Sequence, residues 1–295
     1  MHGRTNRQIE KGVFVLVQQG PCGEEHIAHY TCRRVRKAPR IDGVLDDPAW
    51  QRVERSPRFV DMVTGAPGFF DTRAAAVWND EALYVAFWVE EPFVRANLTE
   101  CDSLIFLEND VEVFIDGGDC YYEFEINALG TIYEVFFIWQ DSYGKRTRFD
   151  VPQYDLAGRR VLSFAGNYDR CAETFWRGTH PRGPRWAFLD WDFPGLRAAA
   201  HVDGKVNDDS VIDKGWTIEV AFPWQGMQWL ANGRSLPPLP GDVWRLFFGR
   251  FECLHTAGKE IDPHPAWCWN RHGIYDTHRP ECFTYVHFSD RYVDE

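Results

Sequence analysis

The chain has 295 residues, 44% of them hydrophobic, and a formal net charge of −12. This hydrophobic share excludes wholesale disorder, and the length is enough to bury a large core. The acidic balance excludes a protein that coats nucleic acid, because neutralising phosphates requires a basic surface. Aromatic residues make up 16% of the chain, and such an excess favours strands or stacked ligands.

The sequence carries few signals of location. No apolar run approaches the ~18 residues of a membrane span, so we expect no spanning segment. The run 13–17 is too short for the apolar core of a signal peptide, which slightly favours a cytoplasmic over a secreted protein. The eight cysteines form no CxxC pair, so zinc ribbons and thioredoxin-like motifs are unsupported. Disulfide and oligomeric states stay open.

The predicted elements follow an N-terminal extension, residues 1–37, with little periodicity and at most one expected edge strand. Residues 38–295 are predicted to form a single domain. Short apolar or alternating runs predict strands, in chain order, at 73–78, 83–89, 111–115, 121–127, 131–138, 198–206, 216–221, 243–251 and 283–288. The one good helix candidate is short, at about 224–231.

The strands between 111 and 138 are separated by short Gly-containing turns, which is typical of an antiparallel meander. Short strands with Gly, Pro and Asp turns predict an all-β fold, an antiparallel β-sandwich of the jelly-roll type. The stretch 141–196 breaks this rhythm and is rich in Trp, Pro and Gly. It predicts a long, aromatic-rich loop insertion or a set of short strands, and ordered loops of that kind often carry function.

Three acidic residues lie two apart on one predicted strand, at Glu108, Asp110 and Glu112, so a strand would place them on one face. This string resembles the ExDxE strand of family 16 glycoside hydrolases. The resemblance implies a nucleophile at Glu108 and an acid/base at Glu112, since retaining hydrolysis needs two carboxylates flanking one sugar bond. The alternative is a turn that enters a strand, with Asp110 capping backbone amides.

A second resemblance covers about residues 38–289. In order and spacing, six segments resemble the family 9 carbohydrate-binding modules and their DOMON-like relatives. These segments are IDGVLDDPAW (41–50), AVWNDEALY (76–84), ENDVEVFID (108–116), YYEFEINALG (121–130), GWTIEVAFP (215–223), and Trp269 with 280–288.

This resemblance implies a β-sandwich that binds a mono- or oligosaccharide without cutting it, as part of carbohydrate catabolism and in association with glycosidases. No cofactor is required. One alternative is a glycosidase that hydrolyses O-glycosyl compounds with Glu108 and Glu112. The other is a DOMON-like module with a cofactor or structural role, in which the sugar site has decayed.

Carried over residue by residue, the resemblance places the first aromatic clamp near Phe106 and a strand carboxylate at Glu112. The family's arginine and asparagine on the next strand fall at Glu125 and Asn127, so the arginine is lost. The second clamp falls near His278, where Trp267 and Trp269 could substitute from upstream. Arg250 either grips sugar oxygens or pairs internally with Glu252. The candidate ligand-binding residues are therefore Phe106, Glu112, Glu125, Asn127, Arg250, Trp267, Trp269 and His278.

Two metal hypotheses remain. Family members bind structural calcium, which implies Asp116, Asp119 and Glu123 as ligands here, because calcium takes several hard oxygens. Solvated turn acids are the alternative. Five histidines also gather in the last forty or so residues beside three cysteines, without an HxH or HxxxH pair. Loops could bring three of them together around a metal, and local hydrogen bonding is the simpler account.

Overall fold

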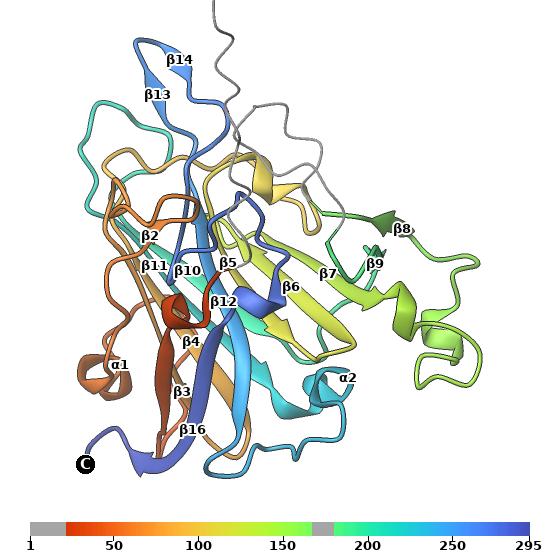
Figure 1. Ribbon diagram of the computed structural model, residues 1–295. Coiled ribbons are helices and arrows are strands. Elements are labelled where there is room, and N and C mark those ends of the chain that lie inside the picture. Colours follow the sequence, from red (N-terminus) through yellow and green to blue (C-terminus); the bar gives the residue numbers. More distant parts are fainter. Residues whose placement is uncertain (1–21, 167–179) are drawn as a thin grey trace, which may run out of the picture.

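The computed structural model describes residues 22–166 and 180–295, and most of its regular elements are strands (Figure 1). The first strands are β1 (His29–Arg34), β2 (Val60–Asp61), β3 (Thr72–Trp78), β4 (Ala82–Val89), β5 (Asp110–Asp116), β6 (Cys120–Ile126), β7 (Ile132–Trp139) and β8 (Val161–Phe164). They are followed by β9 (Arg185–Phe188), β10 (Arg197–Asp203), β11 (Gly215–Pro223), β12 (Val243–Phe251), β13 (His255–Thr256), β14 (Lys259–Glu260), β15 (Ala266–Cys268) and β16 (Thr284–Tyr292).

Helices are short. The α-helices are α1 (Pro48–Arg52) and α2 (Gln228–Ala231), and 3₁₀ turns occur at Glu24–His26, Ile105–Leu107, Gln140–Ser142, Pro152–Tyr154, Trp224–Met227 and Pro280–Cys282. In the described part of the chain, no helix has the length and apolar character needed to cross a bilayer. The predicted helix at 224–231 is present as a 3₁₀ turn that continues into α2. All nine predicted strands are present, with small differences at their ends.

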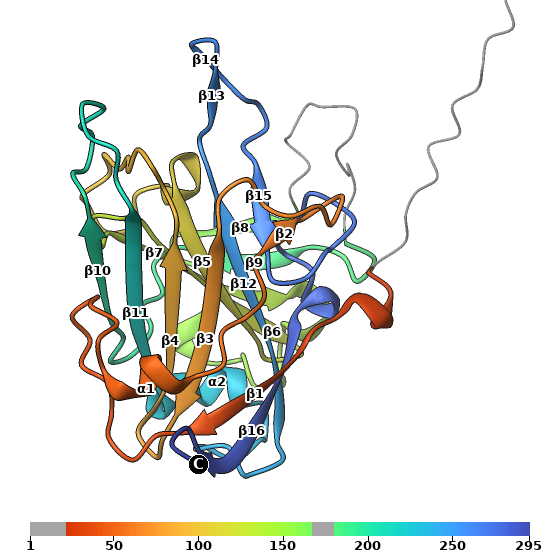
Figure 2. The same ribbon diagram turned by 90° about the vertical axis from the view of Figure 1, so that its left-hand side faces the viewer.

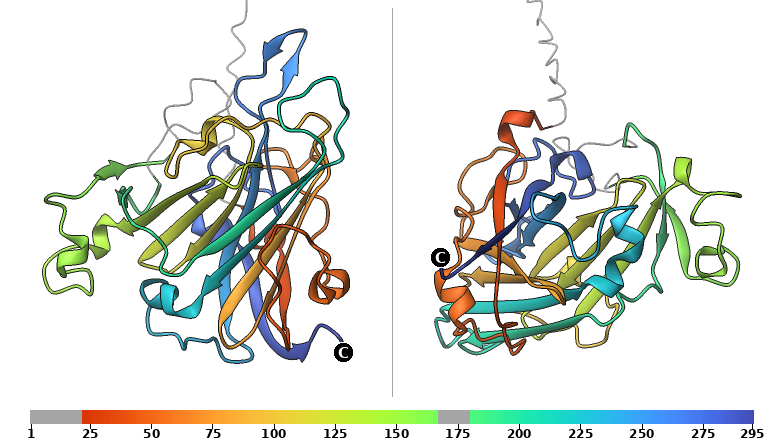
Figure 3. Two further views of the ribbon diagram at one scale, coloured as in Figure 1. Left: turned by 180° about the vertical axis from the view of Figure 1, so that it is seen from behind. Right: turned by 90° about the horizontal axis from the view of Figure 1, so that it is seen from below.

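The strands form one continuous hydrogen-bonded path that folds into a sandwich. Its order is β10-β11-β4-β3-β1-β16-β12-β5-β6-β7-β9-β8. One layer consists of β10, β11, β4 and β3 and faces the viewer in Figure 2. The left panel of Figure 3 shows the molecule from behind, with the β10–β11 edge of this layer in front. The other layer contains β12 and the meander β5–β6–β7, which is antiparallel as predicted. The all-β sandwich is therefore confirmed.

The N-terminal strand β1 connects the two layers, which differs from the predicted edge strand. β1 pairs in parallel with both β16 and β3, so it lies inside the strand path and not at an edge. A disulfide also joins Cys22 to Cys282, close to β16. The described part of the expected extension, from residue 22, is thus integrated into the sandwich, and the expectation of an edge strand is wrong. Short, local patterns could not reveal this, because parallel pairing joins segments about 250 residues apart.

The main core lies between the two layers and consists of the apolar face of each strand. On β6 this face carries Tyr122, Phe124 and Ile126, all fully buried. Two tryptophans from the motif segments 76–84 and 215–223, Trp78 and Trp216, are also buried there. Side chains alternate along a strand, so the opposite face of the meander is left to form a second surface.

The insertion 141–196 extends the second layer. β9 pairs with β7, and β8 pairs with β9, so two short strands lengthen the sheet beyond the meander. Aromatic side chains from the same stretch, Tyr154, Trp191 and Phe193, pack on the main core. Residues 167–179 of the insertion lie outside the described residues. The two alternatives for this stretch, a loop insertion and a set of short strands, thus both apply in part, because its loops alternate with strands.

Gly215 offers a test of the pairing between β4 and β11. Its φ is +132°, and a Cβ added there would lie 1.9 Å from the carbonyl oxygen of Val89. We expect Gly215→Ala to lower the free energy of unfolding by on the order of 2 kcal/mol or more, measured by urea denaturation. Gly233→Ala is the control, because φ is +85° but a Cβ would meet no atom within 4 Å. Equal losses in both variants would show that backbone strain, not the clash, is responsible.

Candidate functional site

A cavity of about 310 Å³ lies on the face of the meander that points away from the main core. Its floor carries three carboxyl groups, Glu112 from β5 and Glu123 and Glu125 from β6. We call this cavity the acidic pocket. It is lined by Leu104, Phe106, Glu112, Glu123, Glu125, Tyr133, Phe137, Leu162, Phe164, Gly166, Ala187, Leu189, Phe251, Thr277 and His278.

The register of the sheet sets the floor of the acidic pocket. Across four adjacent strands, Gly249, Glu112, Glu125 and Tyr133 lie directly opposite one another. Opposite residues in an antiparallel sheet hold their side chains about 5 Å apart on the same face. Gly249 makes room for the Phe247 ring, since a Cβ there would lie 2.4 Å from that ring. The row therefore has one glycine, two carboxyls and one aromatic side chain.

A fourth carboxyl, Asp110 at the start of β5, lies beside the floor without lining the pocket itself. Ligating oxygens of Asp110, Glu112 and Glu125 all lie within 4.8 Å of one another, and all three residues are buried. Asp110 Oδ1 accepts a hydrogen bond from the backbone N–H of Phe251 (3.1 Å). Burial raises the pKa of Asp110 and of Glu125 well above their ordinary values and that of Glu123 to about 8. Water is a better solvent for a carboxylate than this floor, so protons or a ligand must stabilise it.

Basic groups near the floor compensate only partly. The guanidinium of Arg185 lowers the pKa of Glu123, but this effect is smaller than that of burial. His278 Nδ1 lies 3.1 Å from the Tyr121 hydroxyl. Burial, with a contribution from Arg185, lowers the pKa of His278 well below its ordinary value. This histidine is therefore neutral at physiological pH and offers a polar contact without a charge.

Aromatic rings form the walls of the acidic pocket. They come from the Ile105–Leu107 turn, β7, β8 and β12, and are Phe106, Tyr133, Phe137, Phe164 and Phe251. Phe106 is half-buried and contacts Tyr133 edge to face, with ring centroids 5.6 Å apart. Rings above a polar floor can take the C–H face of a sugar while directed polar groups bind its hydroxyls.

Four of the eight predicted ligand-binding residues line this pocket: Phe106, Glu112, Glu125 and His278. Asn127 does not line it. Its amide nitrogen donates to the Leu98 carbonyl (2.9 Å) and to Glu108 Oε1 (2.6 Å), so it fixes a loop. These four positions therefore share one cavity, and three of them carry side chains that differ from the pattern that the resemblance implies.

Arg250 is fully buried and points into the sandwich. It pairs with Glu252 (2.5 Å) and Glu91 (3.5 Å) and donates to Thr72 Oγ1 (2.8 Å). Of its two predicted roles, the structure shows the internal ion pair. The sugar grip was wrong, because alternation along β12 turns Arg250 away from the pocket that its neighbour Phe251 lines.

The two upstream tryptophans are core residues. Trp267 is 3% and Trp269 is 8% exposed, and both belong to the main core. β15 carries Trp267 and pairs with both β12 and β2, which covers it. Trp269 packs edge to face on Tyr30, with centroids 5.0 Å apart. The expectation that they replace the family's clamp is therefore wrong.

The carboxylates of the hydrolase hypothesis have separate surroundings. Glu108 accepts hydrogen bonds from the N–H of Asn97 (2.8 Å), the N–H of Leu98 (3.3 Å) and the amide of Asn127 (2.6 Å). It does not line the acidic pocket, whereas Glu112 does. A retaining glycosidase needs both carboxyls to face one bond. This pair lacks that arrangement.

The expected calcium ligands are turned to different partners. Asp116 Oδ1 accepts from the N–H of Gly118 (2.8 Å), and Asp119 is paired with Arg148. Glu123 faces the acidic pocket. In residues 22–166 and 180–295, these three are not among the groups whose ligating atoms converge. The chain's carboxylates at this place do not fit a calcium ion.

A second hollow, of about 390 Å³, lies over the other layer near Trp88, Arg55 and Lys214. The Arg55 guanidinium stacks on Trp88, 3.8 Å from the ring centroid. This second hollow contains none of the predicted ligand-binding residues, and charged side chains of both signs line it. We therefore treat it as a comparison surface for the acidic pocket.

The sequence analysis missed the other lining residues, among them the wall rings of Tyr133, Phe137, Phe164 and Phe251. A signal was present for two of them. Once Tyr122, Phe124 and Ile126 are assigned to the core face of β6, the pairing with β7 places Tyr133 and Phe137 on the other face. Phe164 and Phe251 meet there only through the long-range packing of β8 and β12.

The raised pKa of Glu123 predicts how stability depends on pH. The folded-state pKa of about 8 exceeds the ordinary 4.5, so between these values the folded state binds more protons than the unfolded state. Stability therefore falls as pH rises through this window. We expect Glu123→Gln to flatten the fall in the free energy of unfolding between pH 5 and 8 by on the order of 1–3 kcal/mol.

Urea denaturation across this pH range provides the measurement. The exposed Glu100→Gln is the control and should keep the wild-type slope. Asp110 and Glu125 also have raised pKa values, so part of the slope should remain in Glu123→Gln. An unchanged slope in Glu123→Gln would contradict the prediction.

Comparison with known proteins agrees with this fold. The family model for carbohydrate-binding family 9 matches residues 67–153, a segment that includes β3 to β7. A candidate carbohydrate-binding protein from Bacteroides uniformis has a similar structure, with a TM-score of 0.54 and 15% identity over 89% of this chain and 99% of that one. No curated protein matches the sequence significantly.

A family 9 carbohydrate-binding module from Caldicellulosiruptor kristjanssonii, solved with cellotriose, gives a TM-score of 0.48 at 13% identity and covers 89% of this chain and 94% of that one. The segment that builds the floor of the acidic pocket thus matches carbohydrate-binding family 9, and this protein is a β-sandwich that resembles that family, as its motifs predicted.

Proposed function

We propose that this protein binds a mono- or oligosaccharide in the acidic pocket without cleaving it. The observation that carries this proposal is one cavity that combines a row of carboxyls with aromatic walls. It includes Phe106, Glu112, Glu125 and His278, the positions at which the family resemblance implies sugar contacts. The family match over 67–153 supports the same function.

The chemistry of the acidic pocket suits a sugar ring. Hydroxyl groups of a sugar can donate to the ionised carboxylates and accept from protonated ones, and buried partners of this kind discriminate strongly between ligands. The rings of Phe106 and Tyr133 offer faces and edges for the C–H groups. A volume of about 310 Å³ is at the small end of ligand pockets, which favours one or two sugar units. We also place this binding in carbohydrate catabolism alongside glycosidases, on the family resemblance alone.

Binding can be tested directly with a panel of mono- and disaccharides and isothermal titration calorimetry. We expect Phe106→Ala and Glu112→Gln each to weaken the best ligand at least tenfold, because each removes one side of the pocket's contacts. Trp88→Ala, in the second hollow, is the control and should leave the affinity unchanged.

The outcomes separate the candidate functions. Loss of affinity in Trp88→Ala alone would move the site to the second hollow. Binding of no sugar by the folded protein would overturn the proposal in favour of a decayed site, and a haem absorption band would favour the DOMON-like cofactor role. Release of sugar from O-glycosyl substrates that is lost in Glu112→Gln would indicate a glycosidase.

The carboxyl-rich floor narrows the ligand class further. At the position of the family's arginine the chain has Glu125, so a contact of positive charge is replaced by one that is neutral or negative. With Asp110 and Glu112 within 4.8 Å, the floor attracts a positively charged group, and the aromatic walls reinforce that attraction. We propose that the pocket prefers sugars that bear an ammonium group.

Three sugars of similar shape test this preference. We expect glucosamine to bind at least tenfold more tightly than glucose at pH 7, and glucuronate more weakly than either. Glucosamine binding should release protons, because a cation lowers the pKa of carboxyls held partly protonated. Calorimetry in buffers of different ionisation enthalpy measures that release. Equal affinities for glucose and glucosamine would contradict the charge preference while leaving sugar binding intact.

A further inference from the structure

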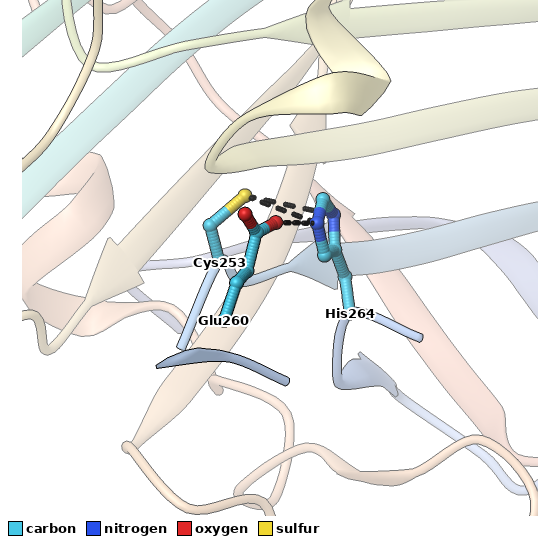
Figure 4. Close-up of side chains that lie close together, drawn as sticks. All are labelled: Cys253, Glu260 and His264. Atoms are coloured by element: carbon cyan, nitrogen blue, oxygen red, sulfur yellow. Dashed lines mark hydrogen bonds and ion pairs between the residues drawn. The ribbon is translucent and has the colours of Figure 1, made fainter. Parts of the chain in front are cut away.

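A second cluster lies outside the acidic pocket, at the base of the projecting hairpin β13–β14 (Figure 1). Cys253, Glu260 and His264 point toward one another there (Figure 4). Their ligating atoms all lie within 4.8 Å of one another. They supply one sulfur, one nitrogen and one carboxylate oxygen, which is a donor set suited to zinc and not to calcium or magnesium.

The distances between the cysteine sulfur and the histidine nitrogens match those around a tetrahedral ion. With Zn–S of about 2.3 Å and Zn–N of about 2.0–2.1 Å, a tetrahedral ion holds sulfur and nitrogen about 3.6 Å apart. Cys253 Sγ lies 3.6 Å from His264 Nε2 and 3.5 Å from Nδ1. Glu260 Oε1 is hydrogen-bonded to the same Nε2, so a bound ion would replace this contact and move the carboxylate aside.

The backbone of each ligand is anchored. The N–H of Cys253 donates to Asn109 Oδ1 (2.7 Å), and the carbonyl of His264 accepts from the Tyr275 hydroxyl (2.6 Å). Glu260 pairs with His255 across the hairpin. Such anchoring limits the entropy lost when a metal orders the side chains, which favours binding.

Exposure and charge also fit. His264 is buried and Cys253 is half-buried, whereas the Glu260 side chain is 49% exposed, so an ion can reach the cluster from solvent. A thiolate and a carboxylate together balance the two charges of Zn²⁺ around a neutral imidazole. Three protein ligands leave a fourth position for water or another donor.

A thiol nucleophile is the competing explanation for these three residues. Reactive cysteines have a lowered pKa because a nearby positive charge stabilises the thiolate. Here burial, assisted by the charges of Glu260 and Asp110, raises the pKa of Cys253 to about 12. A raised thiol pKa is the opposite of what a nucleophilic cysteine shows.

We propose that Cys253, Glu260 and His264 form a binding site for one zinc ion. The site joins the hairpin to the sandwich, and it is independent of the sugar ligand. It uses a thiolate, so it takes zinc and similar transition metals in preference to Ca²⁺ or Mg²⁺.

The first experiment uses the full chain and the metal alone. Zn²⁺ is titrated against a chromophoric chelator, and Co²⁺ is used as a spectroscopic replacement. We expect one Zn²⁺ per chain, no competition from excess Ca²⁺ or Mg²⁺, and a sulfur-to-cobalt charge-transfer band. Folded protein that binds no Zn²⁺, or a cobalt spectrum without the sulfur band, would overturn the proposal.

Variants then locate the ion. Cys253→Ser, Glu260→Gln and His264→Gln should each weaken Zn²⁺ at least tenfold, and Cys253→Ser should also abolish the charge-transfer band. Cys101→Ser and His255→Gln are matched controls, because Cys101 is an exposed free cysteine elsewhere and His255 is exposed on the same hairpin. Circular dichroism checks that each variant folds. Zinc affinity that falls in the controls but not in the three ligand variants would refute this site.

Discussion

The buried guanidinium of Arg250 is the constraint on which the arrangement of this sandwich depends. A charge in the core must be paired and hydrogen-bonded, since its desolvation costs several kcal/mol otherwise. Arg250 meets Glu252 and Glu91, donates to Thr72, and thereby connects β12 to the layer of β3 and β4. Glu91 also accepts from Trp216 Nε1 (2.6 Å) and so adds β11 to the network. Because Arg250 must face inward, alternation turns its neighbour Phe251 outward, where it lines the acidic pocket. The ion pairs of Arg250 and the acidic pocket thus lie on opposite faces of β12.

Local patterns in the sequence were sufficient for the strands and for the class of fold. Alternation predicted a strand at 121–127, and its apolar positions Tyr122, Phe124 and Ile126 are buried. The same patterns could not place β1 beside β16, because that pairing depends on segments about 250 residues apart. The sequence also suggested, wrongly, that Trp267 and Trp269 are available to a ligand. An aromatic residue in a loop-like segment looks available in the sequence, and only the pairing of β15 with β12 and β2 shows that it is covered.

The site shows a similar division. The resemblance singled out Glu112, Glu125 and His278 because it transfers positions along the chain, whatever side chains occupy them, and these three residues line one cavity. It could not predict the electrostatics. Those follow from the juxtaposition of Asp110, Glu112 and Glu125 and from the burial that raises the pKa of Asp110 and Glu125. The loss of one arginine therefore changes the character of the pocket more than its place.

The acidic run from Glu108 to Glu112 illustrates why a motif match alone could mislead. On a strand its carboxylates share a face, yet the structure gives each residue a different task. Glu108 accepts from the N–H groups of Asn97 and Leu98 before the strand begins. Asn109 donates to Glu91 (2.6 Å), an ion-pair partner of Arg250, and accepts from the N–H of Cys253 (2.7 Å) at the proposed zinc site. Glu112 lines the pocket floor, and Asp110 lies beside it, within 4.8 Å of the carboxylates of Glu112 and Glu125. One short segment thus links the ion pairs of Arg250, the proposed zinc site and the acidic pocket. A change in the position of β5 would therefore alter the geometry of all three.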